Sequence, residues 1–185
     1  MLEKLIRKIA QRLDEDKIPY MLIGGQAVLL YGRPRLTRDI DITLGIDADD
    51  FHLVEKACKK LTLKMLPENP EAFAKETRVV PAEDMRSKNR VDFIFSFSEY
   101  ERQALKRAKR VKMENYPVRF ASCEDVVIHK MVAGRAIDVE DVKSILVKHK
   151  ASLDLKYIRR WLSEFGKISE DSQLLQRFNG LLKTV

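Results

Sequence analysis

The first residues of the chain alternate apolar and polar side chains at helical spacing. One helix face carries Leu2, Leu5, Ile6, Ile9 and Leu13. This spacing predicts an amphipathic helix over residues 2–15. The apolar run YMLI predicts a short buried strand, and QAVLLY at 26–31 predicts a second helix that begins at the glycine pair before it. Residues 33–37 (RPRLT) are predicted as a loop, because proline fits poorly inside a helix or a strand.

From residue 39 to residue 122, segments with strand spacing alternate with segments with helical spacing. DIDITL at 39–44 predicts a strand, and a helix capped by Asp49 or Asp50 is predicted to run to about Leu61. Three prolines lie between 67 and 90, so we predict a loop, a weak strand near 77–82 and a turn. Strong strand signals follow at 91–97 (VDFIFSF) and 116–122 (YPVRFAS), with a basic helix at 99–110 between them.

After Ser122 the apolar residues recur only at helical spacing. Four such segments lie at 123–134, 138–149, 154–165 and 169–182. The sequence therefore predicts an α/β (α+β) fold, with a mixed-sheet core at 1–121 and a helical segment at 122–185.

Composition limits the partners and the compartment. The 185 residues suffice for one compact domain, and the formal net charge of +7 favours an anionic partner. A surface dense in charged residues is equally typical of heat-adapted proteins. The two cysteines, Cys58 and Cys123, form no disulfide framework or metal motif. No stretch resembles a secretion signal or a membrane span, so we expect a cytoplasmic protein.

Asp39 and Asp41 interrupt an apolar strand. Side chains alternate along a strand, so both carboxylates project from one face while Ile40 and Ile42 project from the other. Like charges held this close repel unless a cation lies between them, and oxygen ligands of this kind suit Mg²⁺. Asp92 interrupts another apolar strand and is a candidate third ligand. The alternative is ordinary pairing or solvent exposure, with Arg35 or Arg38 as the partner of Asp39.

The glycine pair Gly24-Gly25 lies where a strand is followed by a helix. Backbone N–H groups at a helix start attract anions, and glycines let a phosphate approach the backbone closely. Tight turns also need glycine, so the pair gains its meaning from the aspartates that follow.

Together these residues resemble the nucleotidyltransferase superfamily, the fold of DNA polymerase beta. The match consists of Gly24-Gly25, Asp39-Ile40-Asp41-Ile42 and the later Asp92. The resemblance implies that Asp39 and Asp41 bind Mg²⁺, as one or two ions. Asp92 would be a third ligand or the base that deprotonates the acceptor hydroxyl, and Gly24 and Gly25 would contact the triphosphate of an NTP. Arg38 would contact phosphate beside them.

A second set of residues is similar to the AbiEii-type group, which is known for toxins of toxin–antitoxin systems, and to minimal MNT-type proteins. Lys130, Arg135 and Asp138 match its K-x(4)-R-x(2)-D arrangement, with Asp141 one turn further on. The resemblance implies that Lys130 neutralises the β- and γ-phosphates of the NTP. Gln26 departs from the pattern, since many relatives have Ser or Thr after the glycine pair.

The leading hypothesis is a Mg²⁺-dependent enzyme that transfers NMP from an NTP to a hydroxyl of RNA (such as a tRNA end), a protein or a small molecule. The resemblance adds a small antitoxin-like partner. The first alternative is a degenerate nucleotidyltransferase fold that binds nucleotide or a partner without turnover. The second is a basic nucleic-acid-binding protein, for which the run RQALKRAKRVK at 102–112 is the candidate surface.

Overall fold

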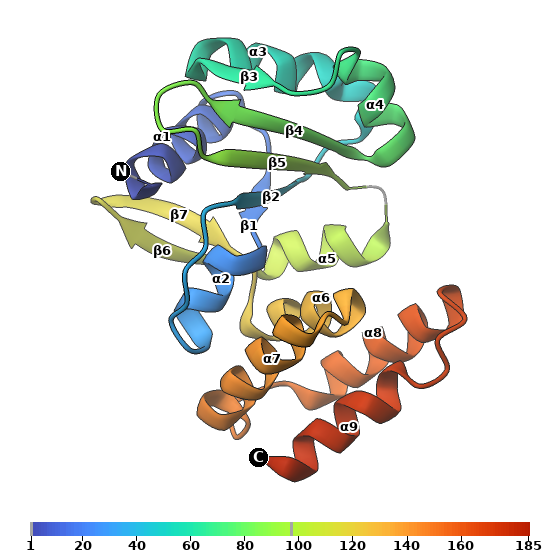
Figure 1. The fold of residues 1–185 in the computed structure, drawn as a ribbon. Coiled ribbons are helices and arrows are strands. Elements are labelled where there is room, and N and C mark those ends of the chain that lie inside the picture. The colour runs from blue at the N-terminus through green and yellow to red at the C-terminus, as the bar shows by residue number, and fades with distance from the viewer. Residues whose placement is uncertain (1, 97) are drawn as a thin grey trace. The chain divides into compact units, whose positions relative to one another are not determined.

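The computed structural model of the chain describes residues 2–96 and 98–185, which form two compact units (Figure 1). The first unit comprises the residues up to Gln26 together with Thr37–Ala121. The second comprises Ala27–Leu36 together with Ser122–Val185. Phe97, the last residue of the strand predicted at 91–97, lies outside the described residues.

A mixed β-sheet forms the centre of the first unit. Within the described residues it has seven strands in the order β3-β4-β5-β2-β1-β7-β6 (Figure 1). Their bounds are β1 Tyr20–Leu22, β2 Ile40–Leu44, β3 Leu63–Met65, β4 Val79–Asp84, β5 Arg90–Phe95, β6 Lys109–Met113 and β7 Tyr116–Phe120. β2 runs parallel to β5 and β1 runs parallel to β7, whereas the other neighbours are antiparallel. This mixed sheet confirms the predicted fold class.

The alternation of side chains along β2 places Asp41 on the face of the strand opposite the core. Ile40, Ile42 and Leu44 are fully buried at every second position, so one face of the strand belongs to the core. Asp41 and Thr43 project from the opposite face, where Asp41 is half-buried. The alternation inferred from the sequence is therefore present, although Asp39 lies one residue before the strand begins.

Helices pack against this sheet in the first unit. Their bounds are α1 Leu2–Glu15, the 3-10 turn η1 Ala48–Asp50, α3 Phe51–Leu61, α4 Pro70–Thr77 and α5 Glu99–Arg107. α1 contacts β7 and α3, while α3 contacts β3. Asp50 occupies the N-cap position of α3, one of the two positions predicted, but its side chain makes no capping hydrogen bond. Asp47 caps the preceding turn η1, where its side chain accepts a hydrogen bond from the N–H of Asp49.

Three elements of the first unit differ from the prediction. The region around Pro70 was predicted as loop but forms α4, because Asn69 caps the helix and proline is well suited to its first position. The short strand β3 follows α3 directly, where no strand was predicted. β6 forms the edge strand of the sheet where the basic helix was predicted to continue. Its hairpin turn uses Glu114 and Asn115, both with positive φ, and this conformation is typical of a two-residue hairpin turn.

Helices make up the second unit. Their bounds are α6 Cys123–Ala133, α7 Ala136–His149, α8 Leu155–Ile168 and α9 Leu174–Thr184, and α2 Gly24–Tyr31 enters this unit from Ala27 onward. α6 contacts α7, α8 and α9, and the buried side chains include Phe178 and Trp161. Asp125 is fully buried and accepts hydrogen bonds from Ser122 Oγ and Tyr157 Oη.

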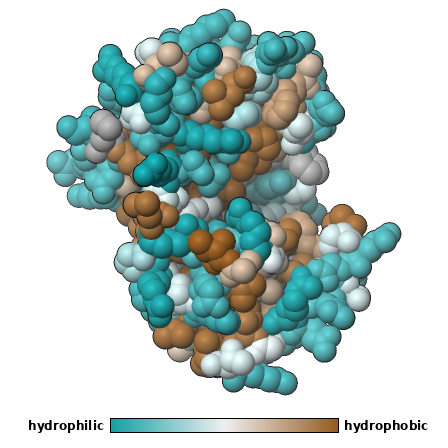
Figure 2. All heavy atoms as spheres, viewed as in Figure 1, coloured by the Kyte–Doolittle hydropathy of each residue, from teal (hydrophilic) through white to brown (hydrophobic). Residues whose placement is uncertain are grey.

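The surface seen in Figure 2 is mostly hydrophilic, with apolar residues in small scattered groups. This agrees with the high share of charged residues, 34% of the chain. No helix in the described ranges has the length and apolar character needed to cross a membrane.

Candidate active site

Asp41 and Asp92 lie opposite each other on two adjacent strands. β2 and β5 run parallel with Asp41 in register with Asp92. Residues opposite each other on neighbouring strands project from the same face of a sheet, so the two carboxylates share one face. Both side chains are half-buried, whereas Asp39 is exposed. The structure thus brings the predicted carboxylates to one region of the first unit.

Gly24 makes the space that Asp41 occupies. The glycine has a φ of +62°, and a Cβ built on it would lie 1.9 Å from Oδ2 of Asp41. Any side chain at this position would therefore collide with the carboxylate. The Asp41 carboxylate lies close to the first residue of α2, where the helix dipole stabilises negative charge. The glycine pair was predicted to make room for phosphate, and in the structure its first member makes room for the carboxylate of Asp41.

The next two residues of α2, Gly25 and Gln26, contact the segment that leads into β2. A Cβ on Gly25 would lie 2.4 Å from Oγ1 of Thr37. Gln26 is buried, and its Nε2 donates a hydrogen bond to the carbonyl oxygen of Asp39, with 3.4 Å between the two atoms. Gln26 therefore fixes the backbone of Asp39, a contact that the sequence motif did not reveal.

Arg90 pairs with one carboxylate of this group, that of Asp92. Its Nε donates a hydrogen bond to Oδ1 of Asp92 at 2.8 Å. This hydrogen bond raises the pKa of Arg90, and the negative charges of Asp92, Asp39 and Asp41 raise it further. Arg90 was not among the site residues predicted from the sequence, although its spacing of two residues from Asp92 on one strand was the available signal. Arg38 is exposed, and the structure gives its side chain no ion pair among the described residues.

The carboxylate oxygens of this group suit a hard divalent cation. In residues 2–96 and 98–185, no three His, Cys, Asp or Glu side chains are arranged to hold a metal by themselves. Mg²⁺ usually takes one or two carboxylates and completes its shell with water and substrate phosphates. The residues present fit that mode of binding rather than an all-protein cage.

Lys130, Arg135 and Asp138 come together in the second unit. Lys130 is buried, and its Nζ lies 2.6 Å from Oδ1 of Asp138 and 3.1 Å from Oδ2 of Asp141. Arg135 Nε lies 2.6 Å from the other oxygen of Asp138. Burial tends to raise the pKa of Asp138, but the hydrogen bonds from Arg135 and Lys130 bring it below its ordinary value. The lysine and the aspartates therefore form a buried network of ion pairs.

Arg35 extends this network. Its Nε and Nη2 each donate a hydrogen bond of 2.9 Å to the carboxylate of Asp141, and this pairing raises the pKa of Arg35. Arg35 had been a candidate partner for Asp39, and its partner in the structure is Asp141. Two further contacts tie the same segment to α7: Lys148 Nζ donates to the carbonyl oxygen of Gly32, and the N–H of Arg33 donates to Ser144 Oγ.

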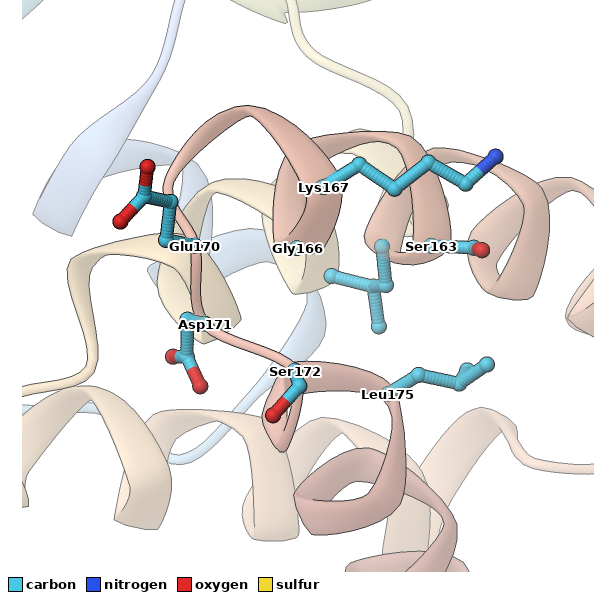
Figure 3. Close-up of a pocket in the computed structure, with 8 residues that line it drawn as sticks. Ser163, Gly166, Lys167, Glu170, Asp171, Ser172 and Leu175 are labelled. Carbon is cyan, nitrogen blue, oxygen red and sulfur yellow. The ribbon is translucent and has the colours of Figure 1, made fainter.

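A cavity of about 370 Å³ lies beside the turn that joins α8 to α9 (Figure 3). Gly166 lines it, and a Cβ at this position would lie 2.9 Å from the carbonyl oxygen of Asp171. Lys167 and Glu170 point away from each other in this view (Figure 3). None of the predicted site residues lines this cavity, so it contributes nothing to the carboxylate group.

Solved structures share this fold. The antibiotic-resistance factor ANT(2'')-Ia is 18% identical over 96% of this chain and 97% of that chain, with a TM-score of 0.62. An antigenic nucleotidyltransferase-like protein from Paracoccidioides brasiliensis is 17% identical over 95% and 92% of the two chains, with a TM-score of 0.58. The lincosamide antibiotic adenylyltransferase LnuA, solved with lincomycin, is 16% identical over 77% and 96%, with a TM-score of 0.53.

Identities this low establish the common fold and leave the substrate open. No curated protein sequence matches the chain. A family model does: the one described as "Nucleotidyltransferase of unknown function (DUF6036)" matches residues 1–181. The chain therefore belongs to this nucleotidyltransferase family.

Proposed function

We propose that this protein transfers a nucleoside monophosphate from an NTP to a hydroxyl acceptor, and that Asp39, Asp41 and Asp92 form the centre of the site. The observation that carries the proposal is the register of Asp41 and Asp92, together with the space that Gly24 leaves for Asp41.

Asp39 and Asp41 are the residues that would hold Mg²⁺, and Asp92, in register with Asp41, acts as the base for the acceptor hydroxyl. When bound, Mg²⁺ supplies charge neutralisation at the phosphates and lowers the pKa of the acceptor hydroxyl. The start of α2 binds the phosphates of the NTP through backbone N–H groups that lack partners within the helix. Arg38 adds an exposed positive charge on the residue before Asp39.

The reaction is an in-line displacement at the α-phosphorus. The acceptor oxygen forms a bond to the α-phosphorus, and the bond from that phosphorus to the bridging oxygen breaks, so pyrophosphate leaves with the electron pair. Asp92 accepts the proton of the acceptor hydroxyl. Its hydrogen bond with Arg90 orients the carboxylate for this role.

The contacts of Lys130 and Arg135 with the triphosphate stay predictions, as do the AbiEii-type assignment, the toxin role and the antitoxin-like partner. The buried ion pairs of Lys130 support a role in holding α6 and α7 together. Experiment can separate an effect of Lys130 on NTP affinity from this structural role.

The test is transfer of label from α-³²P-NTPs, each of the four in turn, with Mg²⁺. Acceptors should span the chemistries of the structural neighbours and of RNA: an aminoglycoside, a lincosamide, a tRNA pool and the protein itself. We expect one donor–acceptor pair to give a labelled product that Asp41→Asn and Asp92→Asn abolish. Transfer that survives both substitutions would exclude the proposed site. A Mg²⁺-dependent thermal shift with an NTP, without transfer to any acceptor, would favour the nucleotide-binding module.

A further inference from the structure

A second cavity in the first unit is lined by four basic side chains. It has a volume of about 500 Å³ and lies where α1, the end of α3 and the β4–β5 turn meet. Its basic residues are Lys4, Lys8, Lys60 and Arg86. One carboxylate, that of Asp84, also lines it, and among the described residues no aromatic side chain does. None of the residues proposed for catalysis belongs to this cavity.

In the described part of the chain none of the four cations forms an ion pair, whereas several exposed lysines on other helices pair with a nearby glutamate. Examples are Lys59 with Glu55 and Lys75 with Glu71. Asp84 accepts hydrogen bonds from the backbone and hydroxyl of Ser87. Burial tends to raise the pKa of this carboxylate, but these hydrogen bonds and the charge of Arg86 lower it. Because four basic side chains face one carboxylate, the cavity keeps a net positive charge.

The arrangement also opposes the stability of helix α1. Lys4 lies in the first turn of α1, where the helix dipole disfavours a cation. Lys8 follows four residues later on the same face, and like charges at this spacing destabilise a helix. General heat adaptation would place charges in stabilising pairs. Local choices that lower stability are expected mainly at functional sites.

We propose that this cavity, which we call the basic cavity, binds a ligand that carries adjacent phosphate groups. Lysines act as point charges for phosphate oxygens, and three lysines and one arginine from three segments match several phosphates rather than one. The lack of an aromatic platform argues against recognition through a stacked base. The shared chemistry is that of a free oligophosphate or of a phosphodiester backbone. This site is independent of the proposed nucleotidyl transfer, because binding here requires neither Mg²⁺ nor turnover.

The test uses inorganic tripolyphosphate and a 12-nucleotide single-stranded RNA as probes, in EDTA and at low salt. Titration calorimetry measures the first and fluorescence anisotropy the second. We expect Lys8→Gln or Lys60→Gln to weaken binding about fivefold, and the triple variant with Arg86→Gln to weaken it by about 100-fold. The matched control is Lys59→Gln/Lys64→Gln/Lys75→Gln, which removes the same charge from exposed positions of the first unit outside the cavity and should change affinity less than about threefold.

The two probes identify the source of the phosphates. Binding of tripolyphosphate that the triple variant loses supports a free oligophosphate, and loss confined to the RNA supports a phosphodiester backbone. Equal affinity in the wild type, the triple variant and the control would overturn the proposal, as would absence of binding of both probes to the wild type. The melting temperature provides the folding check, since removing Lys8 relieves repulsion and should not lower it.

Discussion

The carboxylate of Asp41 occupies the space that a side chain at Gly24 would need, with only 1.9 Å between Oδ2 and a Cβ placed there. The first glycine of the pair and the second aspartate of the doublet are thus one packing unit. A side chain at residue 24 would therefore displace the Asp41 carboxylate, and a neutral residue at position 41 would remove the negative charge beside the start of α2.

Gly24→Ala should therefore lower both stability and activity. The new methyl group would displace Asp41, and the left-handed φ of +62° adds strain, so we expect a loss of about 2–4 kcal/mol in the free energy of unfolding. Urea denaturation measures this loss. The control is Gly180→Ala, because a Cβ at Gly180 of α9 meets no atom within 4 Å. It should stabilise the protein by about 0.5–1 kcal/mol. Wild-type stability in Gly24→Ala would contradict the packing described.

Arg90→Gln should strengthen the binding of divalent cations to the carboxylate group. Arg90 neutralises Asp92 through the 2.8 Å hydrogen bond, so its removal leaves more negative charge for a metal. Binding of Mn²⁺, followed by electron paramagnetic resonance without nucleotide, should tighten by about three- to tenfold. Transfer activity should fall, since Asp92 loses the group that orients it. Arg90→Lys should keep metal affinity closer to that of the wild type. Weaker Mn²⁺ binding in Arg90→Gln would argue that Arg90 supports the metal instead.

Lys130→Met should destabilise the protein strongly. The substitution leaves the carboxylates of Asp138 and Asp141 buried beside fewer positive charges, at a cost of about 3–5 kcal/mol. Chemical denaturation measures the loss, and Lys143→Met, on the exposed face of α7, serves as the control. The double variant Lys130→Met/Asp138→Asn should recover part of the stability. If Lys130 also contacts the triphosphate, the KM for NTP will rise in the double variant even though its fold is restored.

The Asp138 carboxylate should make stability depend on acidity. Its pKa is lowered in the folded state from the usual value of 3.8, so the ionised form is favoured by folding. This contribution is complete above about pH 5 and is lost as the pH falls through 3.8 and below. Unfolding free energies measured between pH 3 and pH 6 should therefore fall less steeply in Asp138→Asn than in the wild type. Parallel pH curves would show that Asp138 titrates alike in both states.

The sequence predicted the elements of this fold that follow from the regular spacing of apolar residues. The alternation of Ile40, Asp41 and Ile42 placed Asp41 on the strand face opposite the core, and the helical spacing in α1 and in α6–α9 is found in the structure. The predictions were wrong where helix capping and turn geometry determine which element forms. Asn69 starts α4 despite the prolines around it, and the turn at Glu114-Asn115 begins a hairpin inside a basic run.

The site depended on contacts that lie far apart in the sequence. A motif can name Asp39, Asp41 and Asp92, but the register of β2 against β5 is fixed only when the sheet forms. The same holds for Arg35, which lies beside the aspartate doublet in the sequence yet pairs with Asp141, 106 residues away. Surface arginines follow no apolar period, so their partners are set by tertiary structure.

The membership of residues 27–36 in the second unit has a consequence for synthesis on the ribosome. These residues emerge early, inside the stretch that builds the sheet, but Asp141, Ser144 and Lys148 are made more than a hundred residues later. Domains usually fold from the N-terminus as they are synthesised. Here the segment between the glycine pair and the aspartates forms its hydrogen bonds to α7 only after α7 has been synthesised. Any early-folded form of the first unit therefore carries a loop that has not yet acquired its final contacts.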